Sequence, residues 1–172
     1  EKLVNIIPSA EMVRFGKNGS DVTAAAIRIS RAYTGRDKVA ICGYHGWQDW
    51  YIGTTSRDLG VPDGTKSLSL TFKYNDISSL EKLFNENPGQ IACVIIEPVG
   101  IEKPDSLLLK QVKELANKNN AVLIFDELKS GFRFALGGIQ ESLDIIPDIS
   151  TFGKAIANGY PLSAIVGRRD IM

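Results

Sequence analysis

The stretch Ala121-Val-Leu-Ile-Phe-Asp126-Glu127 decides the fold, because it is an apolar run that ends abruptly in two acids. An earlier run, Ile91-Ala-Cys-Val-Ile-Ile-Glu97, has the same form. Strands that are covered on both faces of a parallel sheet have this nearly continuous apolar character. Residues 107–118, between the two runs, have the periodicity of a helix. The sequence therefore predicts two parallel strands joined by a crossover helix.

The same alternation of apolar runs and helix-period segments extends along the rest of the chain, without an internal repeat or a linker. Ser20 is a candidate N-cap of the first long helix, and residues 47–66 are predicted as a long functional loop. We predict an α/β fold with a mostly parallel seven-stranded sheet and helices on both faces. The predicted strands are residues 12–15, 38–42, 67–72, 91–97, 121–126, 149–152 and 163–167, and the main predicted helices are 21–33, 77–85 and 107–118.

Composition points to small-molecule chemistry. Of the 172 residues, 44% are hydrophobic and 23% are charged, as in a globular protein with one sizeable core. Twenty basic residues balance twenty acidic ones and no block of like charge occurs, so neither a nucleic acid nor an anionic membrane is expected as a partner. No apolar run approaches the roughly 18 residues that a membrane helix requires.

The cysteines and the histidine narrow the chemistry further. Cys42 and Cys93 lie inside apolar segments without a CxxC spacing, which predicts buried, reduced thiols and a cytoplasmic location. His45 is the only histidine, so a histidine-based metal cluster is excluded and no metal site is expected.

Residues that can carry chemistry follow the predicted strands at their carboxyl ends, where sheets of this kind bind ligands. A lysine amine readily forms a Schiff base with an aldehyde, and a carboxylate at a strand end can keep a pyridine nitrogen protonated. Lys154 and Asp126 together therefore predict a pyridoxal 5'-phosphate site. Taken alone, Lys154 would be a solvated surface lysine, and Asp126 a helix cap or an ion-pair partner of Arg133. The full set is Gly19, Ser20, Tyr44, Glu97, Asp126 and Lys154.

Two further positions suit the same cofactor. Gly19 and Ser20 precede a predicted helix, where free amides and the helix dipole favour a phosphate. A plain strand-to-helix turn with a serine cap would give the same pattern. Tyr44 could stack on a flat ring or fill the core, and the aromatic cluster that continues with Trp47, Trp50 and Tyr51 favours ligand contact.

These motifs, between Val13 and Met172, resemble the major domain of class III (subgroup II, fold type I) pyridoxal phosphate enzymes. That family contains aminotransferases and the glutamate-1-semialdehyde 2,1-aminomutase branch. Several ordered motifs at the family's spacing carry the resemblance. They are Phe15-Gly-Lys-Asn-Gly-Ser-Asp21, Ile27-Arg-Ile-Ser-Arg-Ala-Tyr-Thr-Gly-Arg-Asp37, Tyr44-His-Gly46, Ile95-Ile-Glu-Pro-Val99, Leu123-Ile-Phe-Asp-Glu127, Ser130-Gly-Phe-Arg133 and Gly153-Lys154.

The resemblance implies a role for each site residue. Lys154 would bind the cofactor aldehyde, and Asp126 would pair with the pyridine nitrogen. Tyr44 would stack on one face of the ring, and Leu128 stands where the family has a valine or isoleucine against the other face. Gly19-Ser20 matches the phosphate-binding turn, where the family more often has Gly-Thr. Lys129 replaces the glutamine or methionine that is usual there, a departure that bears on substrate contacts.

The resemblance also implies that residues 1–172 are part of a cofactor-binding major domain. An N-terminal segment and a C-terminal small domain would be absent from this sequence, and a homodimer would complete the site. The expected partners are a small-molecule amino donor and a carbonyl acceptor.

The activity implied by these residues has three versions. The first is intermolecular amino transfer by an aminotransferase, favoured by Gly100-Ile-Glu102, which places an acid where aminotransferases commonly carry one. The second is the intramolecular transfer of the aminomutase, which Ser130-Gly-Phe-Arg133 and the ending Gly167-Arg-Arg-Asp-Ile-Met172 resemble. The third is a noncatalytic ligand-binding member of the fold, or an inactive truncated one.

Overall fold

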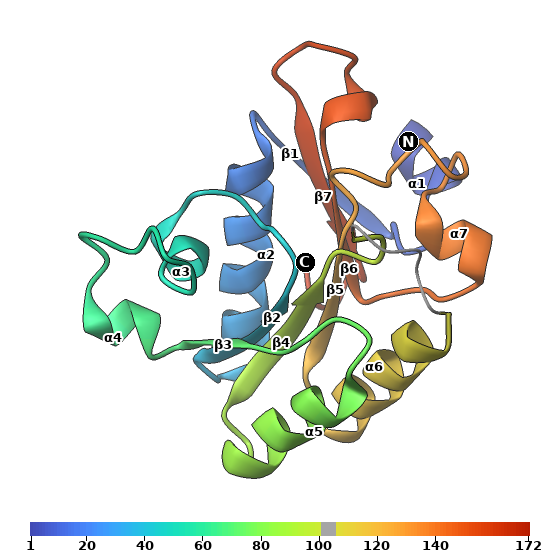
Figure 1. The fold of residues 1–172 in the computed structure, drawn as a ribbon. Coiled ribbons are helices and arrows are strands. Elements are labelled where there is room, and N and C mark those ends of the chain that lie inside the picture. The colour runs from blue at the N-terminus through green and yellow to red at the C-terminus, as the bar shows by residue number, and fades with distance from the viewer. Residues whose placement is uncertain (101–105) are drawn as a thin grey trace.

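The computed structural model describes residues 1–100 and 106–172, and within them seven strands form one sheet (Figure 1). The order across the sheet is β1-β7-β6-β5-β4-β2-β3. Neighbouring strands from β3 to β6 are parallel, whereas β7 is antiparallel to both β6 and β1. The predicted mostly parallel seven-stranded sheet is confirmed. The strands are β1 (Met12–Gly16), β2 (Lys38–Cys42), β3 (Ser69–Thr71), β4 (Ile91–Ile96), β5 (Val122–Asp126), β6 (Ile149–Phe152) and β7 (Ser163–Gly167).

Helices cover both faces of this sheet, as predicted. In Figure 1, α2 (Gly19–Thr34) lies on one side of the strands, and α5 (Ile77–Glu86) and α6 (Ser106–Lys118) lie on the other. Two short helices, α1 (Lys2–Ile6) and α7 (Ile139–Leu143), lie near the β1 and β7 side of the sheet. Neither short helix is marked by a strong sequence periodicity.

The central strands bury alternate residues against the two helical layers. Every residue of β4 and β5 is buried, which explains why both read as continuous apolar runs. Side chains that alternate along a strand point to opposite faces. Burying each of these large side chains contributes about 1.5–3 kcal/mol. Cys93, Ile95, Val122 and Ile124 pack on the α2 side, and Val94, Ile96, Leu123 and Phe125 pack on the α5 and α6 side.

Helix α2 begins earlier than predicted and has a different cap. Its N-cap is Asn18, whose side chain accepts a hydrogen bond from the amide of Asp21, while the Asp21 carboxylate accepts from the amide of Asn18. This is a capping box, in which the two side chains satisfy each other's exposed amides. The prediction of Ser20 as N-cap is therefore wrong. Ser20 lies in the first turn of the helix, and its backbone amide belongs to the group that has no intrahelical acceptor.

The segment predicted as a long loop contains two short helices, α3 (Asp49–Ile52) and α4 (Asp63–Lys66). Trp50 and Tyr51 of α3 are each only 8% exposed and pack into the core cluster on the α2 side. The aromatic richness of this segment therefore serves the core at Trp50 and Tyr51. Only Tyr44 and Trp47, 61% and 73% exposed, remain outside the core.

Glu127 anchors a buried polar network at the end of β5. Its side chain is completely buried, and burial raises the pKa of its carboxyl, while hydrogen bonds to the ionised form oppose that rise. The two carboxylate oxygens accept hydrogen bonds from Ser130 Oγ (2.9 Å), Ile139 N (2.7 Å), Gln140 N (3.3 Å) and Gln140 Nε2 (2.9 Å).

Gln140 extends this network to the N-terminal segment. Its Nε2 also donates to Ser150 Oγ at 3.0 Å, and its Oε1 accepts from the amide of Ser9 at 2.9 Å. The hydroxyls of Ser9 and Ser150 are 3.0 Å apart. The network therefore fixes the start of the chain, α7 and two central strands to one another.

We expect the substitution Glu127→Gln to lower the free energy of unfolding by about 2–4 kcal/mol, because one of the two oxygens becomes an NH₂ group that faces buried donors. Chemical denaturation followed by circular dichroism measures the change. Glu114→Gln on the exposed face of α6 is the matched control and should change stability by less than about 0.5 kcal/mol. Equal effects of the two substitutions would contradict the proposed anchoring role of Glu127.

Candidate active site

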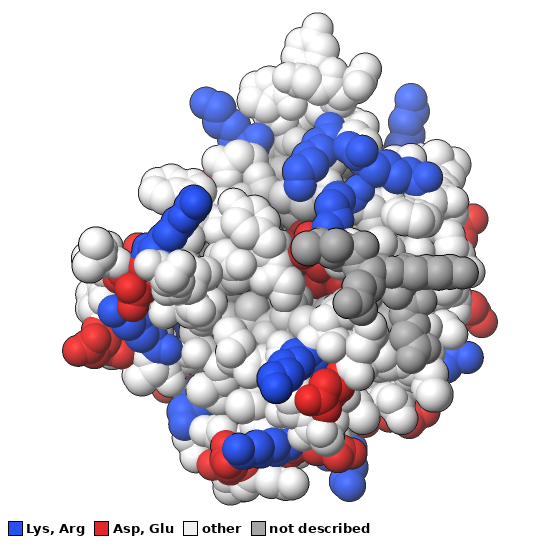
Figure 2. All heavy atoms as spheres, viewed as in Figure 1, with Lys and Arg blue, Asp and Glu red and all other residues white. Residues whose placement is uncertain are grey.

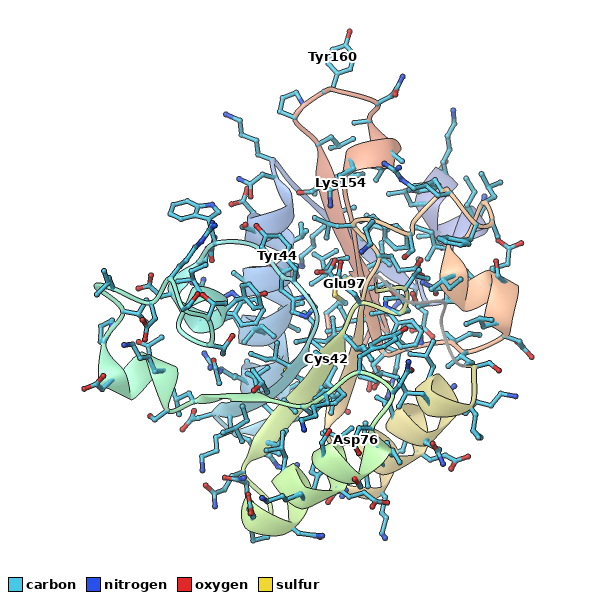
Figure 3. All side chains as sticks on the ribbon, in the orientation of Figure 1. Cys42, Tyr44, Asp76, Glu97, Lys154 and Tyr160 are labelled. Atoms are coloured by element: carbon cyan, nitrogen blue, oxygen red, sulfur yellow. The ribbon has the colours of Figure 1, made fainter. Side chains whose placement is uncertain are left out.

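The carboxyl ends of the parallel strands surround a cavity of about 440 Å³. The chain leaves β2 into Tyr44, β4 into Glu97, β5 at Asp126 and β6 into Lys154. All six residues proposed to bind a cofactor line this cavity, and Figure 3 shows Lys154, Tyr44 and Glu97 close together above the strand ends. The lining residues are Asn18, Gly19, Ser20, Tyr44, His45, Gly46, Trp47, Glu97, Asp126, Leu128 and Lys154.

Asp126 is a buried carboxylate held by three donors. The residue is 3% exposed. Its Oδ1 accepts from Leu128 N and from Thr151 Oγ1, each at 3.1 Å, and its Oδ2 lies 2.7 Å from His45 Nδ1. Hydrogen bonds to the charged form offset the cost of burial, so this set stabilises an ionised carboxylate at a fixed position.

His45 is a site residue that the sequence reasoning missed, because it was weighed only as a metal ligand. The ring is buried, and its second nitrogen, Nε2, lies 3.1 Å from the carbonyl oxygen of Cys42. Both ring nitrogens thus face acceptors, and both contacts are hydrogen bonds only when both nitrogens carry a proton. The ring also stacks on Trp50, with 6.2 Å between the centroids. The feature of the sequence that indicates a site residue here is the position of His45 next to Tyr44, after the end of a predicted strand.

The N-terminus of α2 forms a corner of the cavity that is suited to an anion. The amides of Gly19 and Ser20 are in the first helical turn, where amides have no intrahelical acceptor. A Cβ at Gly19 would overlap Leu128, and one at Gly46, whose φ is +107°, would overlap the Ser20 hydroxyl. Glycine at position 46 therefore allows the left-handed backbone that brings the loop close to the helix, and glycine at position 19 leaves room for the Leu128 side chain.

Lys154 supplies the amine of the site. It is exposed, follows Gly153 directly and begins the 3₁₀ turn η1 (Lys154–Ile156). Its φ of +48° is unusual for a residue with a Cβ, and such strained backbone occurs preferentially at functional sites. Within the described part of the chain, the Lys154 amine has no hydrogen-bond or ion-pair partner, so it is free to react.

This donor set fits the predicted cofactor. An amide-rich helix N-terminus suits a phosphate, a fixed buried carboxylate suits a protonated ring nitrogen, and a free amine suits an aldehyde. The Asp21 carboxylate, which would repel a phosphate, points back to the amides of Lys17 and Asn18 instead.

Other kinds of site receive no support from the described residues. Among them, no group of three or more histidine, cysteine or acidic side chains could hold a metal ion, and no helix has the length and apolarity to span a membrane. Glu102, which bears on the choice between the two transfer reactions, lies outside the described residues.

Comparison with known proteins identifies the family. The family model for class-III aminotransferases matches residues 1–172. The chain is 43% identical, over its whole length, to a 3-aminobutyryl-CoA aminotransferase from Cloacimonas acidaminovorans (strain Evry), and it spans 42% of that relative's length. A transaminase solved with PLP bound superimposes with a TM-score of 0.92 at 30% identity, covering 99% of this chain and 43% of that one. A β-phenylalanine aminotransferase from Variovorax paradoxus gives a TM-score of 0.84 at 28% identity, covering 99% of this chain and 40% of that one.

Cys42 lies beside the site, at the end of β2, but it is not available as a competing nucleophile. Burial, with the nearby Glu97 carboxylate as a second cause, raises the pKa of the Cys42 thiol from 9.0 to about 12. Because a thiolate is the reactive form, the neutral thiol stays unreactive near pH 8.

We expect Cys42 to react with iodoacetamide at pH 8 about a thousandfold more slowly than a free cysteine, since three pKa units separate the two thiols. Mass spectrometry of the digested protein gives the labelling rate at this position. Cys93, which is fully buried and whose pKa is also raised to about 12, should be labelled only after unfolding. Labelling of Cys42 at the rate of a free thiol would show that Glu97 and burial do not control it.

Proposed function

The chain belongs to the class-III aminotransferase family, and on that basis we propose that the protein transfers an amino group between a small-molecule amine and a carbonyl compound. The observation that carries the proposal is the meeting of three elements in one cavity. These elements are the free amine of Lys154, the buried carboxylate of Asp126 and the N-terminus of α2. They match the three reactive parts of pyridoxal 5'-phosphate.

Each residue has a defined task toward this cofactor. When bound, pyridoxal phosphate supplies an electron sink that acidifies the carbon bearing the substrate amine. Asp126 holds a proton on the ring nitrogen, and His45 and Thr151 hold Asp126 in place. The amides of Gly19 and Ser20 bind the phosphate. Tyr44 and Leu128, from the ends of β2 and β5, contact the ring.

Lys154 both retains the cofactor and moves a proton. Its Nζ would hold the cofactor through the aldehyde group. When it is not bound to the cofactor, the same amine would act as a general base and acid at the substrate carbon. Its strained backbone and its lack of a competing partner suit a side chain that has to change position in each half-reaction.

Relatives suggest where the amine lies on the substrate. The curated relative acts on 3-aminobutyryl-CoA, and one solved neighbour acts on β-phenylalanine. In both compounds the amine is on the β carbon of an acyl group. We therefore place β-amino compounds first among the candidate donors.

We extend the proposal to the domains and the oligomeric state of the whole protein. Residues 1–172 would be part of the cofactor-binding major domain, with an N-terminal segment and a C-terminal small domain supplied by the rest of a longer protein. A cytoplasmic homodimer is the expected working form. Both cysteines are unpaired, in keeping with a reducing compartment.

Intramolecular transfer is the second candidate, because the segments Ser130-Gly-Phe-Arg133 and Gly167-Arg-Arg-Asp-Ile-Met172 resemble the aminomutase branch. The products distinguish the two reactions. Release of a keto compound from the donor identifies an aminotransferase, whereas isomerisation of glutamate semialdehyde without a second substrate identifies a mutase.

We expect borohydride to fix pyridoxal phosphate covalently to Lys154, because it reduces a Schiff base to a stable amine. Peptide mass mapping of the full-length protein should find the added mass at this residue. Lys154→Ala should abolish the labelling and lower amino transfer by at least about a thousandfold, since the same side chain is anchor and base.

The control for this experiment is Lys82→Gln on the exposed face of α5, which should leave both the labelling and the transfer unchanged. Wild-type protein that takes up no label, or label placed at another lysine, would overturn the proposal and favour a noncatalytic member of the fold.

A further inference from the structure

A second cavity, of about 550 Å³, adjoins the one described above. Tyr44, Glu97 and Lys154 line both cavities. The second one reaches Cys42, at the end of β2, and Tyr74, and neither Asp126 nor the N-terminus of α2 lines it. The first cavity therefore has the groups suited to the cofactor, and the second is the space open to a molecule that reacts at Lys154.

Uncharged groups form much of the second cavity's wall. They include the neutral thiol of Cys42, the ring of Tyr44, two glycines and Tyr74, whose hydroxyl donates to the carbonyl oxygen of Pro98. The charged side chains described on this wall are Glu97, Lys129 and Lys154. Apart from the reacting amine, the described part of this wall offers a ligand one anion and one cation.

Glu97 is engaged by its neighbours. One carboxylate oxygen accepts a hydrogen bond from the amide of Tyr44 at 3.0 Å, and the other lies 3.5 Å from Lys129 Nζ. The side chain is 14% exposed. Gly43, with a φ of +109°, brings the chain so close that a Cβ there would meet the Glu97 carboxylate at 2.9 Å. Glu97 is thus a fixed anion that positions Lys129.

The Lys129 ammonium group can bind a further anion while it lies beside Glu97. Its ammonium group has three N–H donors, and the structure directs it to one carboxylate oxygen at a long distance. Its side chain is 45% exposed, so the pair with Glu97 is weak and easily exchanged for another anion. On the face shown in Figure 2, basic side chains gather at the upper centre, with an acidic group directly below them.

We propose that Lys129 binds the carboxylate of an amino-acid substrate in the second cavity, and that it thereby selects amino acids over neutral amines. The substrate amine has to reach the position of Lys154. The opposite end of a short substrate then extends along the same cavity, where Lys129 is the cation that the described residues offer to an anion. This inference rests on the proposed function, because it assigns a substrate class to the same site.

The test compares two donors that differ in one charge, 3-aminobutyrate and its primary amide, on the full-length holoenzyme. We expect Lys129→Gln to lower kcat/KM for the acid by about 10- to 100-fold, mainly through KM, because a charge-assisted contact is lost. The amide should change by less than about twofold, and Lys129→Arg should retain most of the preference for the acid. Lys82→Gln, which also removes an exposed lysine with one glutamate partner, is the control.

Calorimetric titration with butyrate, an unreactive carboxylate, gives a readout that is independent of turnover. Its affinity should fall in Lys129→Gln and persist in Lys129→Arg and Lys82→Gln. Equal losses for acid and amide, or unchanged butyrate affinity in Lys129→Gln, would overturn the inference.

Failure of the wider proposal would look different. Wild-type holoenzyme that reacts with neither amine would contradict amino transfer, and butyrate titration would still decide whether Lys129 binds a carboxylate.

Discussion

A carboxylate at the end of a buried central strand cannot be left without donors, and this constraint at Asp126 organises the rest of the site. Three segments meet the need: the turn after β5 through Leu128 N, β6 through Thr151 and the segment after β2 through His45. His45 in turn is fixed by the carbonyl oxygen of Cys42 and by Trp50. The core helix α3 therefore supports the group that sets the electrostatics of the cavity.

The neighbouring acid, Glu127, is also buried and also needs hydrogen-bond donors, but it finds them on the opposite side of the strand. Successive residues leaving a strand face opposite sides, so Asp126 faces the cavity while Glu127 faces α7 and the N-terminal segment. The hydrogen bonds of Glu127 are all to groups that build the fold. Two adjacent residues thus have different surroundings: Asp126 faces the cavity, and Glu127 fixes the segment from 130 to 140.

The sequence predicted the strands well because their burial on both faces leaves long apolar runs, as in β4 and β5. It also predicted six of the eleven residues that line one cavity, since each follows or adjoins a strand end. Three features escaped it for physical reasons. Asn18 and Ser20 are both residue types that can cap a helix, and only the side-chain geometry shows that Asn18 forms the capping box. The burial of Trp50 depends on tertiary packing, and the role of His45 depends on a partner 81 residues away.

The antiparallel return from β6 to β7 explains why Lys154 lies where it does. A parallel successor would need a crossover that carries the chain back to the amino ends of the strands, whereas an antiparallel partner lets the chain turn back at once. That turn, from Gly153 to Leu162, stands above the carboxyl ends of the strands, with Tyr160 81% exposed at its tip (Figures 1 and 3). Lys154 opens it in a left-handed conformation. The break in parallel order therefore places Lys154 directly after the end of β6, at the same cavity as the carboxylate that β5 provides.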